Sequence, residues 1–381
     1  MKIAIDGNEA NIVERVGVNQ YAVEILRGLE NLPEAKKHEF IVYIKDEPLP
    51  DLPAGRPGWQ YKVLLSKGLW VLRTLTPYLW KKENRADVLF TPSHYTPPLL
   101  PFPTVLSVMD LGFLKFQEQF RKRDLWQLKY WGALSIRQAR KIIAISESTK
   151  KDIEKTYPGV RGKVVVTHLG YDRKNFHFPI PNFQIEEVKR KYGIRGEYIL
   201  FLGTLKPSKN VEGLLEAYRL LLANASESGR VQANLNLVIA GKKGWLFESI
   251  FAKVKHLGLE NFVIFTDFIK EDEKPALLSG AKVFVLPSFW EGFGIPVLEA
   301  MACGTPVVVS NAGSLPEIVG KAGVLVDPKS VDSIYKGIKR VVGLPQIEYN
   351  RLVEGVLKEA QRFSWEKTAE QTLEILKETA K

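Results

Sequence analysis

The feature that most constrains the fold is an alternation of short β-rich runs with helical patterns, which occurs twice along the 381 residues. In the first half the runs are rich in valine and isoleucine and are separated by amphipathic stretches. The strand-like runs cover residues 2–6, 40–44, 87–91, 104–108, 141–145 and 163–167, and the helical patterns cover residues 19–32, 121–139 and 148–157. Strands that alternate with helices form a parallel sheet with crossover helices.

After an irregular stretch with prolines at residues 172–182, the alternation begins again. The strand-like runs are residues 198–202, 235–240, 262–265, 283–287 and 306–309, and the helical patterns include residues 211–222, 274–278 and 296–301. Two such sets predict an α/β chain of two doubly wound, Rossmann-like domains. Ligands bind such sheets beyond the carboxyl ends of the strands, so we expect a site in the cleft where the two domains face each other. The last 17 residues read as a helix with Ser364 as its N-cap.

Composition excludes several classes of protein. The amino-terminal run meets Asp6 after a few apolar residues, which is not the pattern of a signal peptide. The longest apolar region, residues 63–80, contains Lys67, Arg73 and Pro77 and therefore does not read as a membrane span. The single cysteine, Cys303, excludes an internal disulfide and a cysteine-based metal site, and we expect it to pack as a small apolar residue. A cytoplasmic protein is the expectation from these patterns.

Positive charge is concentrated in the first half of the chain. Residues 1–175 hold 28 lysines and arginines against 19 acidic residues, a net charge of +9, whereas the remainder carries +2. A basic half attracts an anionic partner, which is a nucleic acid, a phospholipid surface or a phosphorylated substrate; solubility alone is the other reading. No nucleic-acid recognition motif is present, so nucleic acid is not expected as a partner.

Two segments of this half interleave aromatic with basic residues. The first, residues 66–85, places Trp70 and Trp80 among lysines and arginines, and residues 120–131 repeat the pattern. Such a stretch fits a helix lying on an anionic membrane leaflet. It fits equally a helix that faces the core and exposes its basic side to water. Peripheral attachment to the inner face of the cell membrane and a lipid-linked acceptor are therefore expectations of the first reading.

The most informative stretch is WEGFGIPVLEAMACGTP, residues 290–306. It leaves the carboxyl end of a buried strand and enters a helix with Pro296 in its first turn and Gly304 at its end. The amides of Phe293, Gly294 and Ile295 then lie at a helix amino terminus, which favours an anion such as a phosphate.

Two carboxylates flank this loop. Glu291 lies in the turn, and Glu299 lies one turn into the helix that follows. A carboxylate facing a cleft suits sugar hydroxyls because it accepts two hydrogen bonds in a fixed geometry. The alternative for Glu299 is that it only stabilises the amino terminus of its own helix.

A second element supports a diphosphate site. The run YILFLGTLKPSKN, residues 198–210, reads as a strand, a turn and the start of a helix. It brings Lys206 and Lys209 close to a helix start, where they can hold a diphosphate; the alternative is a solvated turn with two surface lysines. The Walker pattern is absent, and no G-x-G-x-x-G follows the first strand, which argues against a nicotinamide cofactor.

The chain resembles the retaining glycosyltransferases of family four, which have the GT-B fold. The resemblance rests on LPSFWEGFGIPVLEAMACGTPVVVSNAGSLPEIVG and AGVLVDP, with Glu291 and Glu299 as the E-x7-E pair. It extends through GTLKPSKN, IAGKKG, TDFIKEDE, KIIAISESTKKDI, THLGYD and the closing FSWEKTA. The GT-B fold implies a first domain of residues 1–175 completed by the final helix, residues 365–381, and a second domain of residues 176–364.

The resemblance also implies roles for individual residues. A nucleotide-sugar donor would bind mainly to the second domain and an acceptor, a glycan or a lipid-linked sugar, mainly to the first. Glu291 would contact the donor sugar, Glu299 the ribose and Lys209 the diphosphate. The implied catalytic residues are Glu291, Lys209 and Asp110, and the implied donor-binding residues are Gly17, Thr204, Lys206, Ser208, Lys209, Phe268, Ile269, Phe293, Gly294, Ile295 and Glu299. No cofactor and no metal are implied, because GT-B enzymes generally work without a bound metal.

The chain departs from the family pattern at two positions. Many relatives carry His-Asp where this chain has Met109 and Asp110, and many carry Arg where it has Ser208. Lys206 would restore the missing positive charge. His94 would face the cleft from the neighbouring strand, so His94, Met109 and Asp110 form the expected acceptor side; a structural histidine is the other reading of His94.

The function expected from these observations is a retaining, metal-independent hexosyltransferase. It would move a hexose from a GDP- or UDP-linked donor to a glycan or lipid-linked acceptor in envelope polysaccharide or glycoconjugate synthesis, in the manner of a mannosyltransferase. Because Met109 and Ser208 depart from the pattern, the alternative is a protein of the same fold that binds a sugar nucleotide or a membrane without turnover.

Overall fold

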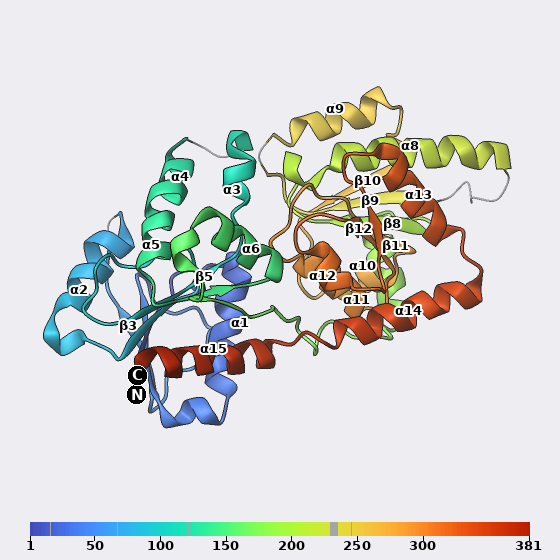
Figure 1. Ribbon diagram of the computed structural model, residues 1–381. Coiled ribbons are helices and arrows are strands. Elements are labelled where there is room, and N and C mark those ends of the chain that lie inside the picture. Colours follow the sequence, from blue (N-terminus) through green and yellow to red (C-terminus); the bar gives the residue numbers. More distant parts are fainter. Residues whose placement is uncertain (16, 67, 120–121, 229–234, 245) are drawn as a thin grey trace. The chain divides into compact units, whose positions relative to one another are not determined.

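The computed structural model describes the whole chain except residues 16, 67, 120–121, 229–234 and 245. The chain divides into two compact units (Figure 1). Unit 1 consists of Met1–Gly170 together with Phe363–Lys381, and unit 2 is Tyr171–Arg362. The chain passes from unit 1 to unit 2 after residue 170 and returns at residue 363, close to the domain boundaries at residues 175 and 365 that the resemblance implied.

Unit 1 is built on a parallel sheet. Within its described residues the sheet has seven strands in the order β3-β2-β1-β4-β5-β6-β7. The strands are β1 Lys2–Asp6, β2 Glu39–Ile44, β3 Trp59–Val63, β4 Val88–Thr91, β5 Thr104–Val108, β6 Lys141–Ala144 and β7 Val164–Val166. Because β1 pairs with both β2 and β4, the strand order reverses between β1 and β4. Such a reversal opens a crevice at the carboxyl edge of a doubly wound sheet.

Helices cover this sheet and join its strands. They are α1 Val18–Asn31, α2 Thr76–Trp80, α3 Gly112–Lys115, α4 Lys122–Gln127, α5 Ala133–Gln138, α6 Glu147–Thr156 and, from the end of the chain, α15 Trp365–Ala380. As predicted, Ser364 caps α15, since its Oγ accepts a hydrogen bond from the amide of Lys367 at 3.1 Å. The final helix packs against α1 (Figure 1), and the ring of Trp365 lies 6.3 Å from the ring of Tyr21.

The helix expected over residues 121–139 is not one regular helix. Residue 121 lies outside the described residues, and a π-helical turn, Leu128–Gly132, separates α4 from α5. A similar turn, Val71–Leu75, precedes α2. The periodicity predicts the buried faces of these segments, but a local change in helical pitch leaves no signal in a hydrophobic pattern.

Unit 2 repeats the architecture. Among its described residues six parallel strands form a sheet in the order β10-β9-β8-β11-β12-β13. The strands are β8 Tyr198–Leu202, β9 Asn236–Ala240, β10 Val263–Asp267, β11 Val283–Leu286, β12 Val307–Ser310 and β13 Val324–Val326. Here the order reverses between β8 and β11, which pair directly. All strands predicted from the sequence are therefore present, and β3 and β13 are additional.

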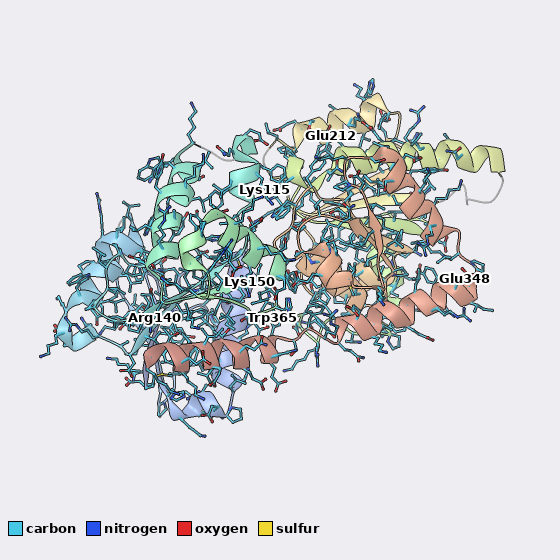
Figure 2. All side chains as sticks on the ribbon, viewed as in Figure 1. Lys115, Arg140, Lys150, Glu212, Glu348 and Trp365 are labelled. Carbon is cyan, nitrogen blue, oxygen red and sulfur yellow. The ribbon has the colours of Figure 1, made fainter. Side chains whose placement is uncertain are left out.

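The helices of unit 2 bury one apolar face each against this sheet or a neighbouring helix. They are α7 Asn182–Lys191, α8 Val211–Ser228, α9 Glu248–His256, α10 Lys274–Ser279, α11 Ile295–Ala302, α12 Leu315–Val319, α13 Val331–Val342 and α14 Gln346–Ala360. The expected packing of Cys303 is confirmed, because this residue is buried behind the end of α11. Side chains fill the interior of both units (Figure 2).

Candidate active site

The loops that follow β8 and β11 meet at the switch point of unit 2. The amide of Phe289 donates to the carbonyl of Ser208 at 2.9 Å, which joins the two loops directly. Asn210 joins them again from a left-handed conformation, with φ at 54°, and its buried Nδ2 donates to the carbonyls of Pro287 at 3.1 Å and Pro328 at 2.7 Å. One amide group thus connects the loops after β8, β11 and β13.

These connections place Lys209 beside Glu291. The Lys209 Nζ lies 2.5 Å from Glu291 Oε1, and Ser288 Oγ donates to the same oxygen at 2.6 Å. The lysine and glutamate side chains are 18% and 11% exposed, so the pair is largely shielded from water but still reachable. Both charges are held at the end of β11 in fixed positions, which is the arrangement that preorganised electrostatic stabilisation requires.

The turn that follows β12 supports Glu291 from the other side. Ser314 Oγ donates to the carbonyls of Glu291 at 3.1 Å and Phe293 at 2.9 Å, and the Ser314 amide donates to Glu291 O at 3.2 Å. Gly313, at a φ of 62°, leaves no room for a side chain, since a Cβ there would lie 2.5 Å from Glu291 O. The Glu291 backbone is therefore held between two loops.

The amino terminus of α11 completes this side of the site. Gly294 is the N-cap with φ at 99°, a conformation that glycine adopts without strain, and Pro296 lies in the first turn as predicted. Phe293 and the following residues bring the first amide groups of α11 next to the Lys209–Glu291 pair. Pro296 has no N–H, and the amides of Val297 and Leu298 donate to the Gly294 carbonyl at 2.9 and 3.3 Å, so Gly294 and Ile295 supply the amides that suit a phosphate at this end of α11.

Glu299 is a buried carboxylate without a hydrogen-bonding partner. Glu299 is only 7% exposed, and its carboxylate makes no hydrogen bond or ion pair with the residues that the structure describes. Burial raises the pKa of Glu299 to about 7; Lys274 opposes this shift, and the charges of Glu271 and Asp172 add to it. A buried carboxylate in this state has a large unmet capacity for hydrogen bonds, which a ligand bearing hydroxyl groups can satisfy.

Lys274 is the nearest source of compensating charge. It begins α10 and forms an ion pair with Glu271. Burial lowers the pKa of Lys274, but the negative charges of Glu299 and Glu271 outweigh that effect, so the pKa is raised overall. Lys274 therefore remains positively charged and interacts with the charges of both Glu299 and Glu271.

The remaining predicted donor residues occupy the same carboxyl edge with one exception. Thr204 and Lys206 precede Ser208 in the loop after β8, and Ser208 is buried. Ile269 is buried in the turn that follows β10, and the neighbouring Phe268 is 45% exposed. Gly17 belongs to unit 1, where it is the N-cap of α1 with φ at 52°.

The predicted acceptor residues lie together at the carboxyl edge of unit 1. His94 follows β4, Met109 and Asp110 follow β5, and His94 Nε2 lies 3.3 Å from the Asp110 carbonyl. The Asp110 carboxylate accepts the amide of Gly112 at 2.7 Å and so starts α3. Burial lowers the pKa of His94, although the nearby Asp110 opposes that shift. The His94 side chain is thus part of a local network at this edge.

Comparison with known proteins shows the family to which the chain belongs. Residues 184–358 match the family model for glycosyl transferases group 1, and residues 16–175 match the model for glycosyltransferase family 4. The O-antigen chain mannosyltransferase B of Escherichia coli is 30% identical over 374 residues, which are 95% of this chain and 96% of the relative. The chain belongs to glycosyltransferase family 4, group 1. The resemblance seen in the sequence is confirmed.

Solved structures give this glycosyltransferase the GT-B fold. Sucrose-phosphate synthase from Thermosynechococcus elongatus superposes with a TM-score of 0.77 at 20% identity, over 99% of this chain and 98% of that chain. HepE from Anabaena, solved in complex with UDP-glucose, superposes with a TM-score of 0.75 at 18% identity, over 99% and 100% of the two chains. Two Rossmann-type units of parallel sheets are therefore the architecture of this enzyme family and of this chain.

The glycosyltransferase site contains residues that the sequence patterns did not select. Ser288 and Ser314 form hydrogen bonds with Glu291, Lys274 acts on Glu299, and Asn210 joins the loops that carry the site. These residues lie at or near the ends of predicted strands and helices, where polar residues are common and carry no special signal. Only the contacts that they make with other loops at the carboxyl edge of the sheet distinguish them from other polar residues at the ends of strands and helices.

Proposed function

We propose that this protein is a retaining hexosyltransferase that transfers a mannosyl unit from a GDP- or UDP-linked donor to a glycan or lipid-linked acceptor. Among its relatives are the O-antigen chain mannosyltransferase B and the serotype-specific mannosyltransferase WbdA, both of Escherichia coli, and RfbU of Salmonella typhimurium, an O-antigen chain mannosyltransferase. These names support a role in the synthesis of an envelope polysaccharide. HepE in complex with UDP supports a nucleoside diphosphate as the bound group.

The observation that carries the proposal is the pairing of Lys209 with Glu291 at the amino terminus of α11. A glycosyl transfer breaks the bond between the anomeric carbon and the β-phosphate oxygen, so negative charge develops on the departing diphosphate. The Lys209 ammonium and the helix amides stabilise that charge. Glu291 pairs with the lysine, and its carboxylate accepts hydrogen bonds from the sugar and favours the cationic character of the anomeric carbon.

Retention follows if the acceptor oxygen attacks from the face that the diphosphate leaves. The new bond joins the acceptor oxygen to the anomeric carbon, and the hydroxyl proton passes to the departing diphosphate oxygen. The protein then needs no strong base, and no metal has to balance the diphosphate charge because Lys209 does so. Lys206 adds positive charge to the same loop, and Asp110 is proposed as a further catalytic residue.

Glu299 is proposed to bind the ribose of the donor. Its buried carboxylate has no hydrogen-bond donor among the described residues, and two adjacent ribose hydroxyls supply two. Phe268 and Ile269, in the turn after β10, are proposed to flank the base. The nucleoside would then lie along the edge formed by the loops after β8, β10 and β11.

The test is binding and turnover with a panel of donors. Thermal unfolding is measured with GDP, UDP, ADP and dTDP, each in EDTA and in magnesium. A nucleotide at a hundred times its dissociation constant stabilises the folded state by about 2.7 kcal/mol. We expect one guanine or uracil nucleotide to stabilise the protein regardless of metal and the matching mannosyl donor to be consumed with retention. Loss of turnover in EDTA that manganese restores would contradict the metal-independent mechanism, and binding without turnover would identify a non-catalytic protein.

Attachment to a membrane surface is a separate part of the proposal. Val71, Leu75 and Leu79 are buried, so one side of the segment 66–85 faces the core; residue 67 of this segment lies outside the described residues. The same segment exposes Leu72 and Trp80, and Trp126 and Tyr130 are exposed on α4 and the turn after it. None of the helices in the described parts of the chain is long and apolar enough to cross a membrane. Equal, negligible sedimentation with anionic and neutral vesicles would contradict surface attachment.

A further inference from the structure

The switch point of unit 1 holds a second set of chemically distinctive side chains. Asp6 is the last residue of β1, and Tyr95 follows β4, the strand on the other side of the reversal. Loops that leave neighbouring strands at a reversal diverge to opposite faces of the sheet, which opens a ligand site between them. In unit 2 the equivalent position holds Lys209 and Glu291.

Asp6 is a buried carboxyl group of which one oxygen is satisfied and the other is not. It is 6% exposed. Its Oδ1 accepts three hydrogen bonds, from Trp70 Nε1 at 3.2 Å, from the Asn8 amide at 3.3 Å and from Asn8 Nδ2 at 3.2 Å. Its Oδ2 accepts none from the described residues. Burial raises the pKa of Asp6 to about 6, although Asn8 and Trp70 oppose the shift. Asn8 and Trp70 satisfy the hydrogen-bonding capacity of Oδ1, so Oδ2 can accept a hydrogen bond from a ligand.

A second carboxylate lies close to Asp6. Asn19 Nδ2 donates to Glu9 Oε2 at 2.7 Å, and Glu9 Oε1 has no partner in the described part of the chain. Burial raises the pKa of Glu9, while Asn19 and the charge of Lys45 lower it. Burial is the main cause of the raised pKa of Tyr95, and the charges of Asp124 and Glu9 add to it; the charge of Glu9 also adds to the raised pKa of Asp6. The charge of Glu9 is thus felt by a residue on each side of the switch point, Asp6 at the end of β1 and Tyr95 after β4.

Aromatic rings form the rest of this site. Trp70 directs its indole nitrogen at Asp6, so it is not available for the membrane surface that the sequence pattern suggested. The ring of Tyr95 lies 4.8 Å from the ring of Trp131 at an interplanar angle of 32°, and 6.4 Å from the His94 ring. Carboxylate oxygens and an aromatic ring together provide both contacts that a sugar ring needs, since its hydroxyls donate hydrogen bonds and its C–H face packs on an aromatic ring.

We propose that Asp6, Glu9, Trp70 and Tyr95 form the acceptor subsite and that it selects an uncharged sugar unit. Asp6 Oδ2 and Glu9 Oε1 accept hydroxyl hydrogens of that sugar, the Tyr95 ring packs on its apolar face, and Trp70 holds Asp6 in position through its indole N–H. Unit 1 is basic as a whole, but this edge presents two carboxylates with Lys45 as the cation that acts on Glu9. A phosphorylated or carboxylated sugar would bring a third negative charge to them, so such acceptors are disfavoured.

The inference rests on the proposed transfer reaction and is tested with acceptors of different charge. Initial rates are measured with the octyl glycosides of mannose, glucose, galactose and N-acetylglucosamine, and with octyl mannoside 6-phosphate and octyl glucuronide. Binding of the same compounds to the full chain is followed by ligand-observed NMR. We expect a neutral glycoside to bind and to accept sugar at least tenfold more efficiently than either anionic one.

Variants then assign the selectivity to the subsite. In Asp6→Asn and Glu9→Gln, we expect KM for the neutral acceptor to rise about tenfold to a hundredfold, because each loses a charged hydrogen-bond acceptor. The preference for neutral over anionic acceptors should shrink in Glu9→Gln. The donor KM, the stabilisation by nucleotide and the slow hydrolysis of the donor by water should stay unchanged. Glu39→Gln, at the opposite end of the same sheet, is the matched control, and Tyr95→Leu, which removes the ring, tests the aromatic contact if Asp6→Asn unfolds.

The outcomes separate this inference from the proposed function. A preference for the anionic glycosides, binding of no neutral glycoside, or a change in the donor KM alone would overturn the inference while donor binding and hydrolysis still supported the transferase. If no nucleotide binds and no donor is consumed, the proposed function fails and the acceptor subsite fails with it.

Discussion

Lys209 Nζ and Glu291 Oε1 lie 2.5 Å apart, although 82 residues separate them along the chain. The lysine comes from the loop after β8 and the glutamate from the loop after β11, the two strands at which the order of the second sheet reverses. In the unliganded chain the glutamate neutralises the lysine. A diphosphate would therefore compete with Glu291 for the Lys209 ammonium, and this competition predicts that replacing Glu291 affects nucleotide binding and turnover differently.

Replacement of Lys209 by alanine should reduce kcat about a hundredfold or more. The variant loses a preorganised positive charge at the position of the departing diphosphate, and loss of one such group costs about 3 kcal/mol of transition-state stabilisation. The measurement is steady-state kinetics with the best donor of the panel. Lys336→Ala, on an exposed part of α13, is the control and should retain full activity. A Lys209→Ala enzyme with normal kcat would remove the lysine from the mechanism.

Replacement of Glu291 by glutamine should separate binding from turnover. The amide keeps a hydrogen bond to Ser288 but no longer neutralises Lys209, so we expect the nucleoside diphosphate to bind as tightly as before or more tightly. We expect kcat to fall at least tenfold, because the carboxylate no longer stabilises the cationic sugar. Calorimetric titration with the nucleotide and kinetics on the same preparation test both parts. Weaker nucleotide binding in this variant would show that Glu291 does not compete for Lys209.

The affinity for the nucleotide sugar should rise with pH between about 6 and 8. Burial raises the pKa of Glu299 to about 7, so the carboxyl group is protonated below that value and accepts ribose hydroxyls best above it. Because the diester diphosphate of a sugar donor does not titrate in this range, KM for the donor reports on the protein. Glu299→Gln should flatten the profile. An identical profile in that variant would assign the pH dependence to another group.

The same shift predicts the pH dependence of stability. The folded chain holds a proton on Glu299 between the ordinary pKa of 4.5 and about 7, where the unfolded chain does not. The contribution of this group to the free energy of unfolding therefore falls as pH rises through that window. Lys274, Glu271 and Asp172 face the same carboxyl group, and Lys274→Met should steepen the fall because it removes the compensating charge. Urea unfolding at pH 5 and pH 8 checks the difference between the two proteins.

Gly313→Ala should inactivate the enzyme and leave it folded. A Cβ at this position would lie 2.5 Å from the carbonyl oxygen and 2.9 Å from the nitrogen of Glu291, so the catalytic loop must move. A displacement of about 1 Å at a reacting group costs about a hundredfold in rate. Gly258→Ala is a matched control, because its φ of 65° is similar to the 62° of Gly313 and its Cβ would meet nothing within 4 Å. Equal loss of activity in both variants would mean that backbone strain alone is responsible.

Asn210→Ala should destabilise unit 2 by about 2–4 kcal/mol. The change leaves the carbonyls of Pro287 and Pro328 without their donor and places an alanine at a φ of 54°. Asn210→Gly removes the same hydrogen bonds without the backbone strain, so it should cost about 1 kcal/mol less. Thermal unfolding of the two variants gives the comparison. Equal stability of wild type and both variants would contradict the proposed role as the connection between three loops.

The sequence by itself determined the fold class, most of the strands and the glutamate-bearing loop. Buried parallel strands are continuous apolar runs, and a proline and a glycine mark the ends of α11, so these features are local and can be read directly. β3 was not recognised because its run, WQYKV, alternates polar with apolar residues, and β13 has only three residues.

Only the tertiary structure decided which side chains meet. Strand order is set by the packing of crossover helices, not by local propensity, so no local pattern reveals that Lys209 lies beside Glu291 or that Asn210 reaches Pro328, 118 residues away. The same holds for Asp6 and Trp70, which are 64 residues apart and looked like unrelated features of the chain. The physical reason is that a hydrogen bond acts over about 3 Å, and the fold alone brings distant residues that close.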